Sequence, residues 1–241
     1  KNKWFIHITH INLRNIMINQ IYYKLFRNKL FSWDPAKGQT LKNYSKKDRF
    51  SKLDIKTLDL IETHFDFTNK KVLDLGAGVG NYTLKFIDLG ANVDWVDVSK
   101  NFKNIAEEKI ISNENTSINK VKFYNIHLSN ISTIKKKYDL IFNRLSWRYS
   151  FSDKKFANDI AAMLNIGGLL YIKENVWDED NESYGRFSKF QNFIYRNLDY
   201  KIGHPVPLKN KIKRYFILEN FELLHEEFVD TGQEFLFRKI L

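Results

Sequence analysis

Residues 72–83 read VLDLGAGVGNYT, and this stretch decides the fold class. An apolar run typical of a buried strand ends at a turn with three glycines, Gly76, Gly78 and Gly80, and a helical pattern follows. Glycines at such a turn let the backbone approach a ligand closely. Asp74 stands just before the turn, where its carboxylate would repel a phosphate. The stretch therefore predicts a ligand site in an α/β sheet, and the charge of the ligand decides which ligand it is.

The rest of the chain continues the alternation of strands and helices. Apolar runs predict strands at 71–75, 92–97, 120–126, 138–143 and 168–173. Helical patterns fall at 51–66, 80–89, 100–112 and 153–164. This order is typical of a doubly wound, mainly parallel sheet. Two further β-like runs, 221–230 and 233–241, predict an antiparallel C-terminal hairpin closed by the short turn Thr231–Gly232.

We divide the chain into an N-terminal helical extension, residues 1–50, and one domain, residues 51–241. Apolar residues at helical spacing predict an amphipathic helix within residues 1–31, packed on its own domain or, as the alternative, attached to a membrane surface. Residues 33–50 are polar and contain a proline and a glycine, which predicts a connection. We expect the extension to cover the ligand pocket at the carboxyl edge of the sheet.

Residues 181–219 form an insertion in which basic and aromatic residues are interleaved. Such a segment suits an amphipathic helix with buried aromatics, a pocket for a nucleotide-linked sugar, or stacking and phosphate contacts with RNA.

Composition narrows the function. The chain has no cysteine, which excludes disulfides, thiolate nucleophiles and cysteine-bound metals. Thirty-nine Lys and Arg against 28 Asp and Glu give a net charge of +11, which favours anionic partners. We find no apolar run of the length that crosses a bilayer, and we expect a cytoplasmic protein.

A second carboxylate identifies the ligand. Asp97 ends the strand after the glycine turn, about 20 residues on, where dinucleotide-binding folds place the acid that binds a ribose. The alternative for Asp97 is a helix cap at a strand end. S-adenosylmethionine carries a ribose, an ammonium and a sulfonium but no phosphate, so Asp74 would attract it. Asn81 also stands where the dinucleotide pattern requires glycine.

Four stretches in order carry a family resemblance: VLDLGAGVGNYT, GANVDWVDVS, KKYDLIFNR and LNIGGLLYIKE. Over roughly residues 50–241 the chain resembles the class I S-adenosylmethionine-dependent methyltransferases, which implies a Rossmann-like α/β fold and transfer of a methyl group. In that family LNIGGLL, residues 164–170, matches the turn before the fifth strand.

The resemblance also implies residue roles. The acid and glycines of the turn would contact the methionine and adenosine parts, Asp97 would hold the ribose and Val98 would flank the adenine. His127 and Leu128 occupy the position at which the family often has an acid for the adenine amino group. The stretch that passes beneath the transferred methyl matches Asn143, Arg144 and Leu145. The set of cofactor-binding residues is Asp74, Gly76, Gly78, Gly80, Asp97, Val98, His127, Leu128 and Asn143.

The acceptor side is expected after the fourth and fifth strands, where open α/β sheets build active sites. Arg148 can clamp an anionic substrate, Tyr149 can wall a sugar ring or base, and Glu174 can accept a proton from a hydroxyl. Asp178, Glu179 and Asp180 read as a solvated loop, with a metal shared with Glu174 as the alternative; we assign no metal ligands. His204, before Pro205 in a loop, is a further candidate to line the site.

The acceptor itself is predicted to be a small polar or anionic molecule. NRLSWRYSFSDKKF before LNIGG is loosely similar to methyltransferases of surface-polysaccharide pathways, which implies O-methylation of a saccharide or nucleotide-linked sugar. YIKEN also resembles a stretch of the enzymes that methylate protein amino termini, although those hold a histidine near the position of Arg148. RNA methylation fits the charge, but the signature that nitrogen-methylating enzymes carry after the fourth strand is replaced by FNRLSW. A cofactor-binding module without catalysis is the remaining alternative.

Overall fold

The computed structural model describes residues 34–45, 52–113, 118–176, 189–202, 204–218, 220–229 and 232–241. The predicted amphipathic helix within 1–31 and the acidic run 178–180 lie outside these residues. None of the described helices is long and apolar enough to cross a membrane.

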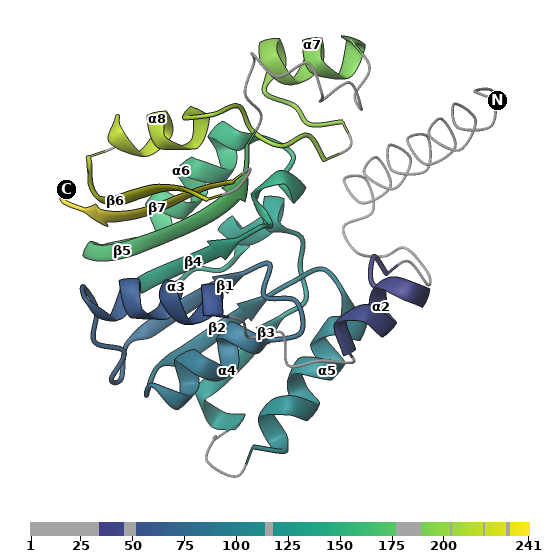
Figure 1. The fold of residues 1–241 in the computed structure, drawn as a ribbon, viewed down its shortest axis with the longest axis vertical. Coiled ribbons are helices and arrows are strands. Elements are labelled where there is room, and N and C mark those ends of the chain that lie inside the picture. The colour runs from purple at the N-terminus through teal and green to yellow at the C-terminus, as the bar shows by residue number, and fades with distance from the viewer. Residues whose placement is uncertain are drawn as a thin grey trace.

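The molecule is built on one seven-stranded sheet (Figure 1). Its strands are β1 (Lys71–Leu75), β2 (Asn92–Val96), β3 (Val121–Tyr124), β4 (Tyr138–Arg144), β5 (Leu164–Asn175), β6 (Phe221–Val229) and β7 (Gly232–Lys239). They lie in the order β3-β2-β1-β4-β5-β7-β6. The first five are parallel, and β7 pairs antiparallel with β5 and β6. The predicted α/β class, parallel sheet and antiparallel hairpin are confirmed.

Helices cover both faces of the sheet (Figure 1). They are α2 (Gly38–Ser45), α3 (Lys52–Glu62), α4 (Asn81–Asp88), α5 (Lys100–Ile111), α6 (Asp153–Met163), α7 (Lys189–Leu198) and α8 (Lys211–Ile217), with 3-10 turns η1 (Ile118–Lys120), η2 (Leu128–Thr133) and η3 (Trp147–Tyr149).

Successive strand residues alternate between two apolar cores. Val72 packs with side chains from α3, α4 and α5, whereas Leu73 packs with side chains from α6, α8 and η2. This is the period of two that a strand covered on both faces requires. Ile212 and Phe216 of α8 belong to the second core, so the end of the predicted insertion 181–219 packs on the sheet.

Strand β5 begins earlier than the sequence predicts. Leu164 pairs with Tyr138 and Leu169 with Leu140, so these two pairs are separated by four residues in β5 and by one residue in β4. The predicted turn LNIGGLL is therefore wrong at its start: it is a bulge within β5, because apolar Leu164, 1% exposed, enters the core and takes its place in the sheet.

The N-terminal segment docks on the start of α5. The Ser99 hydroxyl donates to Asp34 Oδ1 (2.6 Å), the Asn101 backbone N–H donates to Asp34 Oδ2 (3.1 Å), and the Tyr44 ring lies 5.2 Å from that of Phe102. Residues 33–50 were predicted as a connection within the helical extension, and the structure forms helix α2 in them. The described part of the extension thus lies beside the strand end that carries Asp97.

Candidate functional site

The carboxyl ends of β1, β2, β4 and β5 converge at the point where strand order reverses, between β1 and β4. Open α/β sheets bind ligands in the crevice at this point. The glycine turn follows β1 and Asp97 follows β2. The segment SWRYS, residues 146–150, comes after β4, and the segment KEN, residues 173–175, ends β5. The sequence-predicted residues on these strand ends are therefore brought to one edge of the sheet.

The glycine turn is fixed to its neighbours by backbone contacts. The Gly76 and Ala77 N–H groups donate to Val96 O at 2.8 and 3.1 Å. Gly76 has φ of +72°, and a Cβ there would lie 2.3 Å from the Ser146 Cβ. Only glycine fits this close approach, which holds the start of the turn against the segment after β4.

Gly78 has a different environment. Its φ is +54°, its N–H donates to Asp97 Oδ2 at 3.0 Å, and a Cβ would meet nothing within 4 Å. At Gly80, by contrast, a Cβ would lie 2.8 Å from the Ala106 Cβ of α5. Of the turn's three glycines, Gly78 faces the open side, where a ligand can lie on the backbone.

Asp97 connects the turn to the start of α5. Besides the Gly78 contact, its Oδ1 accepts the Ser99 N–H at 2.9 Å, and Ser99 in turn caps α5. Burial raises the pKa of Asp97 to about 6, although these N–H donors lower it. Each carboxylate oxygen keeps a second lone pair, so Asp97 can both hold the turn and accept the hydroxyls of a ribose.

Asp74 lies beneath the turn. Its side chain is 2% exposed, and the Thr83 hydroxyl donates to its Oδ2 at 2.6 Å. Burial raises the pKa of Asp74 to about 7, against the hydrogen bond from Thr83, and the nearby Asp97 raises it further. Asp74 therefore gives the floor of the site a negative charge that depends on pH.

The predicted adenine-side residues have mixed surroundings. Val98 is half-buried directly after Asp97, whereas Leu128 is 5% exposed and belongs to the core. His127 Nδ1 accepts the Ser129 N–H at 3.1 Å, and its ring stacks 4.4 Å from Phe151. Burial lowers the pKa of His127 to about 3, so this imidazole is neutral.

Backbone strain marks the segment after β4. Leu145 has φ of +54° and its N–H donates to Lys173 O at 2.7 Å. A left-handed leucine is rare and persists only where its surroundings hold it, which is common at functional sites. Asn143 donates to Leu75 O and Ser146 Oγ, while its Oδ1 is buried without a partner among the described residues. Sequence patterns missed Ser146 and this strain.

Arg148 and Glu174 meet in an ion pair. The Arg148 Nη2 donates to Glu174 Oε1 at 2.6 Å, and its backbone N–H donates to Oε2 at 3.1 Å. The Asn175 N–H also donates to Oε1, at 2.8 Å. Glu174 is 0% exposed, and burial raises its pKa although the Arg148 charge lowers it. Glu174 was expected to accept a proton from the acceptor; it lies at the end of β5 but is buried, because the guanidinium covers it.

Tyr149 is 44% exposed, and its phenol interacts electrostatically with residues of both predicted parts of the site, Arg148 and Glu174 as well as Asp97. Burial raises the Tyr149 pKa, so the phenol stays protonated and can donate a hydrogen bond. The His204 ring packs edge-on against it at 4.6 Å.

A buried charge network that the sequence did not predict supports this segment. Lys201 is 0% exposed; it pairs with Asp153 Oδ1 at 2.5 Å and donates to Trp147 O and Ser150 Oγ, both at 3.0 Å. Trp147 Nε1 also donates to Asp153, at 2.7 Å. Burial acts to raise the pKa of Asp153, but the Lys201 and Lys211 charges outweigh it and the pKa is lowered.

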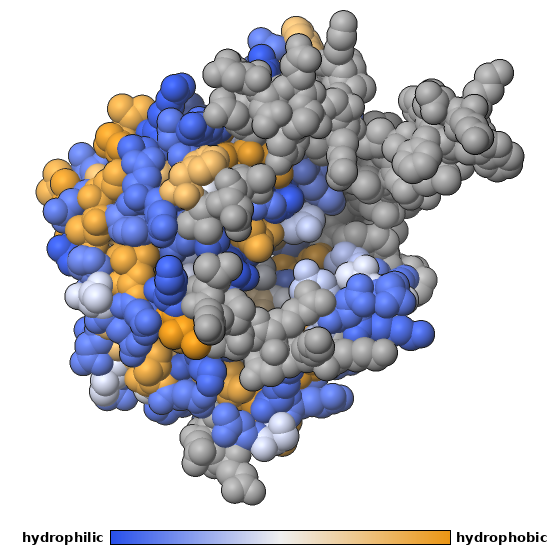
Figure 2. Space-filling model, in the orientation of Figure 1, coloured by the Kyte–Doolittle hydropathy of each residue, from blue (hydrophilic) through white to orange (hydrophobic). Residues whose placement is uncertain are grey.

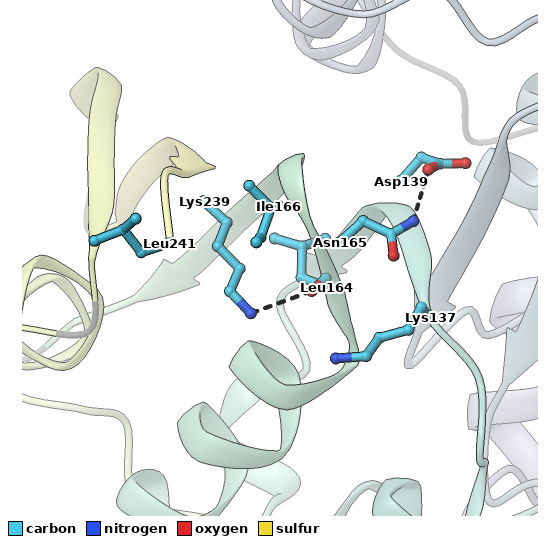
Figure 3. Close-up of a pocket in the computed structure, with 7 residues that line it drawn as sticks. All are labelled: Lys137, Asp139, Leu164, Asn165, Ile166, Lys239 and Leu241. Carbon is cyan, nitrogen blue, oxygen red and sulfur yellow. Dashed lines mark hydrogen bonds between the residues drawn. The ribbon is translucent and has the colours of Figure 1, made fainter.

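A separate hollow of about 560 Å³ lies at the other end of the sheet, lined by Lys137, Asp139, Leu164, Asn165, Ile166, Lys239 and Leu241 (Figure 3). Its ammonium groups are engaged: Lys137 donates to Ala162 O at 2.5 Å and Lys239 to Ala161 O at 2.8 Å, at the end of α6. Exposed apolar side chains gather on the same side of the molecule, near the C-terminus (Figure 2). The lysines of the hollow cap the C-terminal end of α6, and no residue of the predicted site lines the hollow.

The described residues contain no group of three or more His, Cys, Asp or Glu side chains that can hold a metal ion.

The open backbone over Gly78 and the remaining lone pairs of Asp97 fit a ligand with hydroxyl donors, and the Asp74 carboxylate favours a cationic one. Protonation of the Asp74 carboxylate would remove the negative charge that favours a cationic ligand.

Comparison with known proteins agrees with this geometry. Residues 47–198 match the family model described as AdoMet dependent proline di-methyltransferase. A search of curated proteins finds no matching relative. Solved structures with the same fold include TehB from Haemophilus influenzae, which is 20% identical to this chain. The match covers 80% of this chain and 67% of that chain, with a TM-score of 0.59.

Two further structures extend the likeness. An O-methyltransferase family protein from Burkholderia thailandensis is 13% identical to this chain. The match covers 96% of this chain and 71% of that protein, with a TM-score of 0.61. An S-adenosylmethionine-dependent methyltransferase from Methanosarcina mazei is 15% identical to this chain. The match covers 76% of this chain and 97% of that protein, with a TM-score of 0.58. At these identities the likeness concerns the fold.

Proposed function

Because the chain belongs to the family of AdoMet-dependent proline dimethyltransferases, and is thus an S-adenosylmethionine-dependent methyltransferase, we propose that its acceptor is an amino nitrogen. The family's description names dimethylation of proline. The acceptor class that we infer from it is the α-amino group of a peptide or protein with proline as its first residue.

The chemistry of an amine places modest demands on the site. When bound, S-adenosylmethionine supplies an electrophilic methyl group on a sulfonium. An α-amino group has a pKa of about 7.7–8.0, so a useful fraction of it is neutral near pH 7 without help from a base. A sugar hydroxyl keeps its proton at that pH and requires a positioned base or a metal. For an amine, alignment supplies most of the rate.

The observation that carries the proposal on the acceptor side is the engagement of Glu174. This carboxylate, the predicted base, is 0% exposed and accepts three hydrogen bonds, two from Arg148 and one from the Asn175 N–H. In this arrangement Glu174 holds residues 146–150, the Arg148 segment, in place and does not face the acceptor. Arg148 and Tyr149 then form the wall on which the acceptor lies.

O-methylation of a saccharide or nucleotide-linked sugar, predicted from the sequence, is the competing acceptor, and RNA methylation and a binding module without catalysis stand behind it. The likeness to an O-methyltransferase rests on 13% identity and does not favour oxygen over nitrogen.

The test is methyl transfer from radiolabelled S-adenosylmethionine to two matched sets of acceptors. One set contains peptides that begin with proline or alanine, each with its amino-acetylated twin; the other contains UDP-glucose and UDP-glucuronic acid. We expect label only in peptides with a free amino terminus, and two methyl groups on the proline nitrogen. Label in the sugars, or equal label in the acetylated peptides, would refute an amine acceptor.

A further inference from the structure

His204 lies outside the residues that match the family model, 47–198, yet it is part of the acceptor wall. It belongs to the loop between α7 and α8, and its ring packs edge-on against Tyr149 with centroids 4.6 Å apart. The charges of Lys201 and Arg148 act on the ring. A residue far along the chain is thereby placed beside the Arg148 segment.

The two ring nitrogens of His204 have different environments. Nδ1 is sealed from solvent and has no hydrogen-bond partner among the described residues. The residue as a whole is only half-buried. Nε2 has no hydrogen bond among the described residues and is not a buried unpartnered atom, so it is the ring nitrogen that keeps contact with solvent. Burial, with the two neighbouring cations, lowers the pKa of His204 to about 4, so the ring is neutral at pH 7.

A neutral imidazole carries one N–H, and the surroundings decide which nitrogen bears it. A buried N–H without a partner is rarer and more costly than a buried acceptor without one. This difference in cost favours the tautomer of His204 that carries its proton on Nε2. In that tautomer the ring has a hydrogen-bond donor on its solvent-exposed nitrogen, and the phenol of the neighbouring Tyr149 is a second donor.

The two cations near the ring are each held in an ion pair, with Asp153 shared between Lys201 and Lys211. Arg148 pairs with Glu174 at 2.6 Å and Lys201 with Asp153 at 2.5 Å. Uncharged donors beside neutralised cations suit a carbonyl oxygen. An α-amino group always has such an oxygen on its own residue, and fixing it fixes the direction of the nitrogen lone pair.

We propose that His204 is a substrate-binding residue that donates its Nε2–H to the carbonyl oxygen of the residue whose amino group is methylated. The inference rests on the proposed amine acceptor. It makes the protein selective for amines that belong to a peptide over simple amines.

The experiment uses the full chain with His204→Phe, which keeps ring packing and removes the donor, and His204→Gln, which keeps an N–H donor. His225→Phe on β6 is the matched control, because its ring also has a buried nitrogen without a hydrogen-bond partner but lies on the edge strand. KM and kcat are measured with a proline-initiated peptide and with pyrrolidine, which has the amine but no carbonyl.

We expect His204→Phe to raise the KM for the peptide about tenfold, the loss of one hydrogen bond to a buried partner, with kcat and cofactor affinity unchanged. His204→Gln and His225→Phe should stay within about threefold of the wild type, and pyrrolidine should not distinguish the variants. An unchanged peptide KM in His204→Phe, or an equal loss with pyrrolidine, overturns the inference and leaves the amine acceptor standing. A wild type that methylates no amine refutes both.

If His204→Phe does not fold, nitrogen NMR of wild-type protein with ¹⁵N-labelled histidine decides the point. With the His204 signals assigned through His204→Gln, a proton on Nε2 at pH 7 is expected. A proton on Nδ1 contradicts the inference.

Discussion

Gly78 and Gly167 have similar backbones and opposite positions in the molecule. Their φ angles are +54° and +76°, and at both a Cβ would meet nothing within 4 Å. Gly78 lies in the turn after β1 at the ligand edge, whereas Gly167 lies in the β5 bulge at the other end of the sheet. Substitutions at these two glycines therefore distinguish the effect of backbone strain, which both share, from the effect of contact with the cofactor, which only Gly78 is expected to have.

Alanine at either glycine should lower stability by about 1–2 kcal/mol, since a side chain is strained at these φ angles. Only Gly78→Ala should also weaken S-adenosylmethionine binding, by tenfold or more, because the new methyl group occupies the surface on which the cofactor lies. Thermal unfolding measures the first effect and calorimetric titration the second. Equal cofactor affinity in the two variants would refute the placement of the cofactor over Gly78.

The carboxylates of the cofactor site make its affinity depend on pH. Burial raises the pKa of Asp97 to about 6 and of Asp74 to about 7. Hydroxyl donors and a cationic ligand favour the ionised carboxylates, so binding lowers both pKa values and releases protons below about pH 7. Affinity should therefore rise from pH 5 to pH 7 and then level off.

Calorimetry of S-adenosylmethionine binding at pH 6 in two buffers with different ionisation enthalpies counts these protons. Asp97→Asn should bind more weakly at pH 7 and release fewer of them. Proton uptake on binding, or an affinity that does not change between pH 5 and pH 7, would contradict these roles for the carboxylates.

The cofactor half of the site could be predicted because its chemistry is local. Asp74 and the glycines sit within one short stretch, and Asp97 follows at the spacing that a β-α-β unit dictates. The acceptor half depends on tertiary contacts. Nothing near Lys201 in the sequence points to Asp153, and the strain at Leu145 follows from its contact with Lys173.

At the scale of elements, the loop between α7 and α8 holds the segment between β4 and α6. Lys201 contributes its side-chain contacts to Trp147, Ser150 and Asp153, and its backbone N–H donates to Phe151 O at 2.8 Å. Asp199 accepts the Lys154 N–H at 2.9 Å at the start of α6. The two elements form one unit, and Arg148 and Tyr149 are positioned by it.

Lys201→Met should destabilise the protein by about 3–5 kcal/mol, because it leaves Asp153 buried with one cation fewer. Lys155→Met is the control: Lys155 also pairs with an aspartate, Asp159, but its side chain is 55% exposed, and its loss should matter by about 0.5 kcal/mol or less. Urea unfolding measures both. Similar midpoints for the two variants would show that the buried pair does not hold the segment.

Element boundaries were predictable where one residue type marks them. Strand β1 occupies the predicted residues 71–75 because its apolar run ends at glycine. The bulge in β5 was not predictable, since Asn165–Gly168 carry ordinary turn residues and only the pairing of Leu164 with Tyr138 draws them into the sheet. Helix α2 was missed for a similar reason: its contacts are with distant α5.

At the scale of the whole molecule, the sheet separates a chemical end from a structural end. The strand ends at the reversal of strand order hold Asp97, the glycine turn and the ion pair of Arg148 with Glu174. The other end holds the hollow in which lysines cap α6. The residues predicted for the reaction therefore share one end of the sheet, and the net charge of +11 is a property of the whole chain that does not by itself select the acceptor.

The central claim is that the methyl group goes to nitrogen. The most direct measurement is carbon NMR of the product formed from S-adenosylmethionine with a ¹³C-labelled methyl and a peptide that begins with proline and also contains serine and glutamate. We expect a single N-methyl signal that converts to that of an N,N-dimethyl prolinium with a fixed positive charge. Label in an O-methyl ether or ester signal, with no N-methyl signal, would contradict it.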